Sequence, residues 1–204
     1  MKHDLIIVLD FGAQYSQLIA RRVREAKVYC EILPYHTPVA QILARAPRGI
    51  ILSGGPASVY AKGAPHVDPA LFQAGVPLLG ICYGMQLMSQ ALKGRVQKAS
   101  HREFGLAPLQ VKSPRALFAR LPSTLKVWMS HGDQVTRLPG GFKTLASTST
   151  CPFAAAADEK RKLYGIQFHP EVVHTQMGSR LLENFVLRIA GARPTWTMGS
   201  YERT

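Results

Sequence analysis

The chain has 204 residues, of which 47% are hydrophobic, and its mean hydropathy is +0.00. This length suits one well-buried α/β domain and is short for two, and the composition is that of an ordinary globular protein. No apolar run approaches the roughly 20 residues that cross a bilayer, and the first residues lead into a strand-like run rather than a signal peptide. Three cysteines far apart (Cys30, Cys82 and Cys151) predict neither a disulfide framework nor a zinc site, so we expect a reducing, cytoplasmic location.

The formal net charge of +13 comes partly from two basic clusters, in residues 93–102 and 160–162. Such clusters can mark a nucleic-acid-binding surface. Here they fall in predicted loops or hairpins, without interleaved aromatic residues or a recognition-helix or RNP pattern. We therefore favour a solvated basic face, or one that docks an acidic or nucleotide-handling partner.

The first eighty or so residues alternate between short apolar runs and amphipathic segments. The apolar runs, typical of buried parallel strands, are 5–9, 28–33, 49–52 and 78–81. Helices are predicted from about Leu18, over 39–46, and as one turn over 69–74. This alternation indicates a parallel, doubly wound sheet that binds ligands at the carboxyl ends of its strands.

The third apolar run ends in Ser-Gly-Gly-Pro at 53–56. Adjacent glycines allow backbone N–H groups to face inward with no side chain in the way, which would suit a donor to an oxyanion. A simple Gly-Pro turn explains this stretch equally well.

The fourth apolar run leads into Gly80-Ile81-Cys82-Tyr83-Gly84, a G-x-C-x-G turn before an amphipathic helix over 85–92. This is the thiol form of the nucleophile elbow, in which flanking glycines let strand and helix approach closely. Cys82 would lie at a helix N-terminus, which favours a thiolate, and the N–H of Tyr83 would help to bind an oxyanion. The alternative is a tight turn with a small buried cysteine.

After residue 92 the pattern changes to short β-like runs separated by Gly, Pro and Ser. The runs are 106–111, 125–129, 143–146, 153–157 and 163–168, followed by a closing helix over 178–190. The polar turn at 158–162 makes the last two runs a hairpin. The fold class is therefore α/β: a mostly parallel, doubly wound open sheet flanked by helices, with a smaller antiparallel or mixed β portion in the second half.

Two of these runs end in polar residues suited to catalysis. Ser130-His131-Gly132-Asp133 follows one run and is predicted to be a loop, and Gln167–Glu171 ends another. In the second segment His169 is followed by Pro170 and Glu171, which suits a base oriented by a carboxylate. Cys82, His169 and Glu171 would then form a nucleophile, a base and an orienting group. No metal site is predicted, because no ligand motif supports one.

Three motifs together resemble the class I (Cys-His-Glu triad) glutamine amidotransferase family. They are S-G-G-P at 53–56, G-I-C-Y-G-M-Q at 80–86 and Q-F-H-P-E at 167–171. More selective stretches are similar to the glutaminase domain of the family's GMP synthetase branch: 10–14, 54–60, 127–133 and 168–175, leading to 181–185. The resemblance covers nearly the whole chain.

The resemblance implies that Cys82 attacks the side-chain amide of L-glutamine to form a glutamyl thioester, which water hydrolyses. His169 would activate the thiol and protonate the leaving ammonia, and Glu171 would orient His169. The oxyanion donors would be the N–H groups of Gly55 and Tyr83. The residues implied to hold the substrate's carboxylate and amine are Gln86, Ser130, His131, Gly132 and Asp133. Asp10 and Gly12 match the branch motif, but the resemblance assigns them no role.

The resemblance also implies a partner, because members of the branch continue into an ATP-pyrophosphatase synthetase domain that adenylates XMP and receives ammonia. No S-G-G-x-D-S pyrophosphate loop occurs in this sequence. We expect no cofactor in this chain, with ATP and Mg only on the partner domain, in the same polypeptide or a separate subunit. Residues 1–190 would be the amidotransferase domain and 191–204 a linker resembling the start of the synthetase domain.

Three alternatives remain at this point, one of them a γ-glutamyl hydrolase in which the same Cys-His pair acts on peptides. The same chemistry would serve a glutaminase subunit of another synthetase, for carbamoyl phosphate or anthranilate. A basic, non-catalytic interaction module with the same fold is the alternative from a different class. Neither a membrane nor a nucleic acid is expected as a partner.

Overall fold

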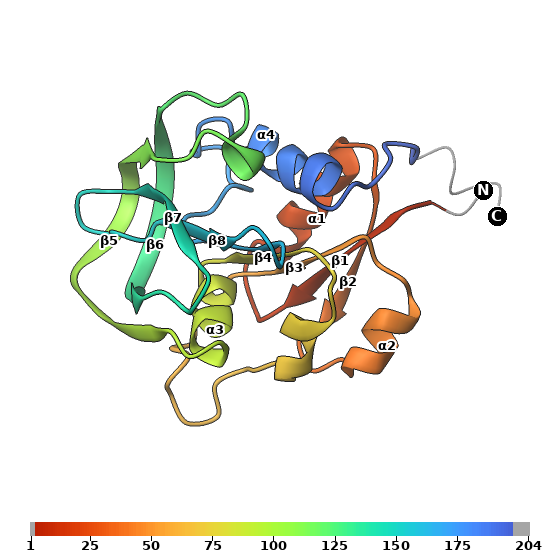
Figure 1. The fold of residues 1–204 in the computed structure, drawn as a ribbon, viewed down its shortest axis with the longest axis horizontal. Coiled ribbons are helices and arrows are strands. Elements are labelled where there is room, and N and C mark those ends of the chain that lie inside the picture. The colour runs from red at the N-terminus through yellow and green to blue at the C-terminus, as the bar shows by residue number, and fades with distance from the viewer. Residues whose placement is uncertain (1–2, 198–204) are drawn as a thin grey trace.

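The structure is a computed structural model that describes residues 3–197, so the end of the predicted linker, 198–204, lies outside the described residues. Within that range one sheet has the strand order β2-β1-β3-β4-β9-β8-β7-β5-β6 (Figure 1). The strands are β1 (Leu5–Asp10), β2 (Tyr29–Pro34), β3 (Gly49–Leu52), β4 (Leu78–Ile81), β5 (Arg95–Val111), β6 (Thr124–Arg137), β7 (Lys143–Ser147), β8 (Ala155–Asp158) and β9 (Leu163–Ile166). The first four strands and β9 pair in parallel, and the pairs from β9 to β6 are antiparallel. The predicted α/β sheet, parallel in its first half and antiparallel in its second, is confirmed.

Helices cover both faces of the parallel half of the sheet (Figure 1). They are α1 (Ser16–Glu25), α2 (Val39–Ala44), α3 (Tyr83–Ala91) and α4 (Gly178–Glu183), which continues into a π-helix (Asn184–Ile189); Pro69–Gln73 and Ala116–Phe118 are 3₁₀ turns. Alternate residues of β1 enter different cores, because successive side chains of a strand point to opposite faces. Ile6 and Val8 pack with α1 and α4, whereas Ile7 and Leu9 pack with α2 and α3. This is the doubly wound arrangement that the sequence predicts.

The ribbon of β5 and β6 is longer than predicted and corrects two expectations. The segment Ser130–Asp133 is part of β6 rather than a loop, and residues 95–102 are part of β5, which pairs antiparallel with the next strand, rather than a loop. The two strands pair with each other, with Lys98 opposite Asp133 and Glu103 opposite His131, and the register shifts between Lys98 and Glu103. Polar side chains on both faces hide this pairing from a search for apolar alternation. The cluster at 160–162 does lie in the turn between β8 and β9, as predicted.

The parallel strands β3, β4 and β9 place three segments at one edge of the sheet. Their carboxyl ends lead into residues 53–56, Cys82 and residues 167–171. Motifs separated by more than one hundred positions in sequence thereby meet where open α/β sheets bind their ligands. Among the described residues, the longest apolar helix is too short to cross a bilayer.

Residues 191–197 lie back against the first half of the domain. The N–H of Trp196 donates to the carbonyl of Lys27 at 2.8 Å, and its ring lies 6.4 Å from that of Tyr29. Arg193 forms an ion pair with Asp4 at 3.0 Å. The described part of the predicted linker is therefore attached beside the outer strand β2.

Candidate active site

Cys82 lies on a strained turn between β4 and α3. Its φ and ψ angles are 52° and −106°, outside the regions that most residues adopt. A Cβ at Gly80 would lie 2.6 Å from the backbone of Gly84, and one at Gly84 would lie 2.6 Å from Leu52. Glycine is therefore required on both sides of the turn, and the turn fixes the cysteine at the N-terminus of α3.

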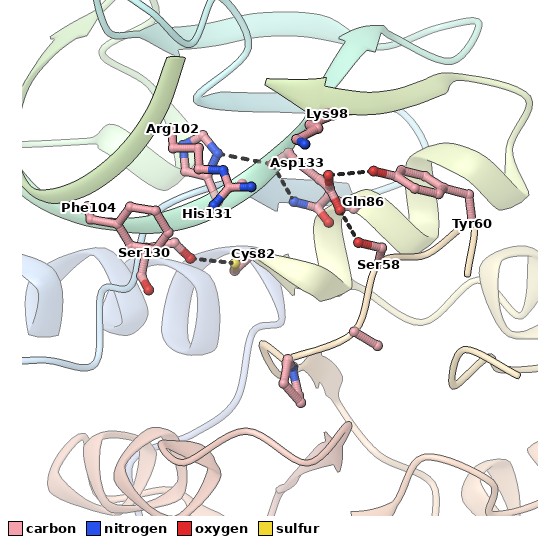
Figure 2. Close-up of a pocket in the computed structure, with 14 residues that line it drawn as sticks. Ser58, Tyr60, Cys82, Gln86, Lys98, Arg102, Phe104, Ser130, His131 and Asp133 are labelled. Atoms are coloured by element: carbon pink, nitrogen blue, oxygen red, sulfur yellow. Dashed lines mark hydrogen bonds between the residues drawn. The ribbon is translucent and has the colours of Figure 1, made fainter. Parts of the chain in front are cut away.

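Cys82 is 6% exposed and lines a cleft of about 510 Å³ (Figure 2). Its Sγ is 3.8 Å from the carbonyl of Ser130, and the amide Nε2 of Gln167 donates to it at 3.5 Å. The sulfur thus reaches the cleft while neighbouring polar groups hold it in place.

His169 and Glu171 form a buried pair behind the elbow. The ring Nδ1 of His169 lies 2.8 Å from Oε1 of Glu171, whose side chain is 1% exposed. The N–H of His169 donates to the carbonyl of Trp128 at 3.0 Å, which fixes the backbone. A Cβ at Gly54 would lie 3.1 Å from Cε1 of His169 and 3.7 Å from Cβ of Cys82, so the two side chains flank the same glycine. The structure therefore brings the three predicted triad residues together.

The environment of His169 favours the protonated ring. Burial alone lowers its pKa, but hydrogen bonds to Cys82 and Glu171 and the charges of both outweigh burial and raise the pKa to about 10. An imidazolium next to a thiol stabilises the thiolate, which is the nucleophilic form of cysteine. The arrangement can activate a sulfur and later supply a proton.

The two predicted oxyanion donors lie beside Cys82. Gly55 lines the cleft, and a Cβ there would lie 2.8 Å from the carbonyl of Phe11 and 3.5 Å from the ring of Tyr83. Tyr83 is the first residue of α3, and the N–H groups of a first helical turn have no partner within the helix. A site of this kind can bind a negatively charged oxygen next to the sulfur.

All five predicted substrate-binding residues line the cleft: Gln86, Ser130, His131, Gly132 and Asp133. Gln86 donates through Nε2 to the carbonyl of Asp133 at 2.8 Å and to Oε1 of Gln167 at 3.2 Å. His131 has both ring nitrogens engaged, at 3.0 Å from the Asp133 carbonyl and 3.0 Å from Glu103. His131 therefore supports the strand, whereas Gln86 and Asp133 present polar atoms to the cleft.

Several residues of the site escape sequence reasoning. Ser58 and Tyr60 donate to the carboxylate of Asp133, the tyrosine at 2.6 Å, and Lys98 and Arg102 line the cleft from β5 (Figure 2). The serine and tyrosine lie in the 54–60 stretch, whose similarity to the GMP synthetase branch could have indicated a role at the site. No sequence motif indicated a role for Lys98 and Arg102, because their position at the cleft depends on the pairing of β5 with β6.

Asp10 and Gly12 close the turn that follows β1. Oδ1 of Asp10 accepts hydrogen bonds from the N–H of Gly12 at 3.0 Å and from the hydroxyl of Ser16 at 2.7 Å. Gly12 has a φ of +85°, which favours glycine. These contacts are structural, and they place the start of α1.

Glu103, His131 and Cys151 have metal-ligand atoms within 4.8 Å of one another. Glu103 already accepts hydrogen bonds from Thr148, Thr150 and His131, however. Burial, helped by the charge of Glu103, raises the pKa of the Cys151 thiol to about 12, which disfavours the thiolate that metals bind. This donor set fits a hydrogen-bonded cluster that supports β5 and β6 rather than a metal site.

Comparisons with known proteins agree with this geometry. Residues 7–189 match the family described as glutamine amidotransferase class-I. The chain is 59% identical over 196 residues to a GMP synthase (glutamine-hydrolyzing) of Parafrankia sp., covering 96% of this chain and 37% of the relative. It is 55% identical over 203 residues to the protein of the same name from Aliarcobacter butzleri, covering 100% of this chain and 40% of the relative.

Solved structures agree as well. One from Thermoplasma acidophilum, described provisionally as part of a GMP synthase, has a TM-score of 0.85 and 32% identity over 94% of this chain and 96% of its own. A glutamine amidotransferase from Thermotoga maritima shares the fold, with a TM-score of 0.73 and 18% identity over 94% of this chain and 100% of its own. The chain spans about 37–40% of the length of the two curated relatives. The chain belongs to the class I glutamine amidotransferase family.

Proposed function

We propose that this chain is the glutaminase part of a GMP synthase. It hydrolyses the side-chain amide of L-glutamine and supplies ammonia to a synthetase module that aminates XMP to GMP. The observation that carries the proposal is the buried Cys82, His169 and Glu171 constellation at the cleft, in a chain 55–59% identical to GMP synthases.

In the first half of the reaction, the Cys82 sulfur attacks the amide carbon of glutamine. The carbonyl oxygen becomes negative and is bound by the N–H groups of Gly55 and Tyr83, which are fixed in place before the reaction. His169 gives its ring proton to the nitrogen as the carbon–nitrogen bond breaks, so ammonia leaves and a glutamyl thioester remains. Glu171 holds the ring in the orientation that this transfer needs.

In the second half, water attacks the thioester. The neutral His169 takes a proton from the water, and the tetrahedral intermediate collapses with loss of the sulfur. Glutamate leaves, and the thiolate beside an imidazolium is restored. The same residues thus serve both halves, and the chain needs no cofactor of its own for them.

The ammonia acceptor in this proposal is an ATP-pyrophosphatase synthetase module, in the same polypeptide or as a separate subunit, that carries the ATP and Mg. The support is that the relatives named GMP synthase are much longer than this chain. A cytoplasmic location fits the three free, buried cysteines of the structure.

The test measures glutamate release from glutamine by the wild type, Cys82→Ala and a matched control, Cys30→Ala. Loss of a nucleophile that acts within a triad lowers the rate by several orders of magnitude. Cys30 is buried away from the cleft, and burial raises the pKa of its thiol to about 12. Its loss leaves the rate within a few-fold of the wild type. Equal activity of the wild type and Cys82→Ala overturns the proposal.

A second arm supplies the synthetase portion of the Parafrankia relative, with ATP and XMP, and measures GMP. Glutamine-dependent GMP formation that disappears in Cys82→Ala supports the GMP synthase assignment. Glutaminase activity without GMP formation would favour a different synthetase as the partner.

A further inference from the structure

Two basic side chains line the cleft that holds the Cys82 thiol. Lys98 and Arg102 both come from β5 and lie on the wall across from the elbow (Figure 2). Within residues 3–197, neither side chain forms an ion pair or a hydrogen bond. Among the described residues that line the cleft, one acidic side chain, that of Asp133, accompanies them. The described part of the chain therefore leaves an excess of positive charge on this wall.

Free glutamine brings two opposite charges into this cleft. Its α-ammonium and α-carboxylate are attached to the same carbon, and a short aliphatic chain joins that carbon to the amide that Cys82 attacks. Both charges therefore have to be bound close to the sulfur, because leaving either one unpaired in a confined site costs free energy. The carboxylate of Asp133 can pair with the ammonium, and hydrogen bonds from Ser58 and Tyr60 already fix its orientation.

We propose that Arg102 binds the α-carboxylate of the substrate glutamine and thereby selects free glutamine over amides that lack this group. The inference rests on the proposed glutaminase function and adds a specificity-determining residue to it. A guanidinium presents two parallel N–H donors that match a carboxylate, which gives both affinity and a defined orientation.

The strand register distinguishes Arg102 from Lys98. Lys98 pairs with Asp133 across the β5–β6 ribbon, so its charge lies beside that carboxylate. Arg102 lies within the register shift between Lys98 and Glu103, where β5 has no partner residue opposite it, and its Nε would be 3.8 Å from a Cβ placed on Gly132. The guanidinium thus extends over the bare backbone of Gly132, between the Asp133 carboxylate and Ser130, whose carbonyl contacts the Cys82 thiol. This position borders the same cleft as the Asp133 carboxylate and the Cys82 sulfur.

The experiment compares two substrates across four proteins. Glutamine is set against 4-aminobutanamide, which keeps the amide and the amine but lacks the α-carboxylate. The proteins are the wild type, Arg102→Gln, Arg102→Lys and the matched control Lys98→Gln. Each is assayed for ammonia release and for the concentration of each amide that half-protects Cys82 from iodoacetamide, a readout that needs no turnover.

For Arg102→Gln we expect kcat/KM for glutamine to fall about ten- to a hundredfold, mainly through KM, with a matching rise in the half-protecting concentration. Arg102→Lys recovers part of the loss. With 4-aminobutanamide, kcat/KM of Arg102→Gln and of the wild type agree within about twofold, because this substrate has no α-carboxylate for Arg102 to bind. Lys98→Gln affects glutamine much less than Arg102→Gln does.

Three results overturn the inference: no change for glutamine in Arg102→Gln, an equal loss for both substrates, or an equal loss in Lys98→Gln. The last would indicate a general effect of positive charge. If glutamine neither protects Cys82 of the wild type nor is hydrolysed by it, the proposed glutaminase function itself fails, and this inference fails with it. Protection of the wild type that is unchanged in Arg102→Gln removes the inference alone.

Discussion

At the scale of single residues, the proposed chemistry depends on how His169 is charged. The side chain is 8% exposed, and burial opposes the positive form. Cys82 on one side and Glu171 on the other outweigh burial. Glu171 is itself buried, and among residues 3–197 its second oxygen, Oε2, has no hydrogen-bond partner. The imidazolium of His169 therefore compensates most of the negative charge of this buried carboxylate, and each of the two charges stabilises the other.

This coupling makes a prediction about stability and pH. The pKa of His169 is raised from 6.5 to about 10, so its ionic contribution is present in full below pH 6.5 and is lost as the pH rises toward 10. In His169→Gln that contribution is missing at every pH. We therefore expect the difference in free energy of unfolding between wild type and variant to shrink steadily from pH 6.5 to 10, as measured by urea denaturation.

The matched control for that series is His36→Gln, which replaces an exposed histidine remote from the cleft. Its difference from the wild type should stay small and flat across the same range. A difference between the wild type and His169→Gln that is constant over this interval would contradict the raised pKa.

At the scale of elements, local sequence predicts the elbow but not the wall opposite it. Strand, turn and helix at 78–92 follow one another directly, and the glycine spacing around Cys82 has one steric explanation. Residues 95–98 and 103–104 form a strand because they pair with residues 130–137, and some of their polar side chains face the cleft or a buried cluster. Periodicity detects strands through apolar alternation, so it fails where both faces of a ribbon are polar for a functional reason.

The elbow gives a prediction at this scale. Gly84→Ala adds a methyl group 2.6 Å from both Cβ and the carbonyl oxygen of Leu52, so β3 and α3 have to separate. Overpacking of this kind costs about 1–3 kcal/mol, against which the gain in helix propensity is at most about 1 kcal/mol. We expect a net loss of stability in urea denaturation, together with a lower kcat, because the shift moves Cys82 relative to His169.

Gly140→Ala is the control for the same methyl group. A Cβ there has no heavy atom within 4 Å, and its φ is not positive. It should leave stability and glutaminase activity close to those of the wild type. If Gly84→Ala behaved in the same way, strand and helix would not be in the close contact that we describe.

At the scale of the whole molecule, an apolar strip borders the cleft. Phe104 and Leu106 point to the same side of β5 and are 67% and 58% exposed. Phe104 also lines the cleft, so the strip and the cleft are continuous. Exposed apolar surface of this kind marks binding sites for other proteins or modules. We expect the synthetase module of the proposed function to bind on this surface.

Leu106→Lys tests this expectation, because it places a charge in the strip without touching the cleft lining. With the synthetase module present, glutamine-dependent GMP formation should fall about tenfold, as expected when one central apolar contact of an interface is lost. GMP formation from added ammonium chloride should be unchanged, because ammonia from solution bypasses the glutaminase. Glutamate release by the chain alone should also be unchanged.

The control Ala40→Lys adds the same charge to an exposed position of α2, beside the parallel half of the sheet, and should leave all three rates as in the wild type. Equal loss in the two lysine variants would show that added charge matters and position does not. No loss in Leu106→Lys would place the synthetase on another face, because an interface centred on this strip cannot tolerate a buried, unpaired lysine at its centre.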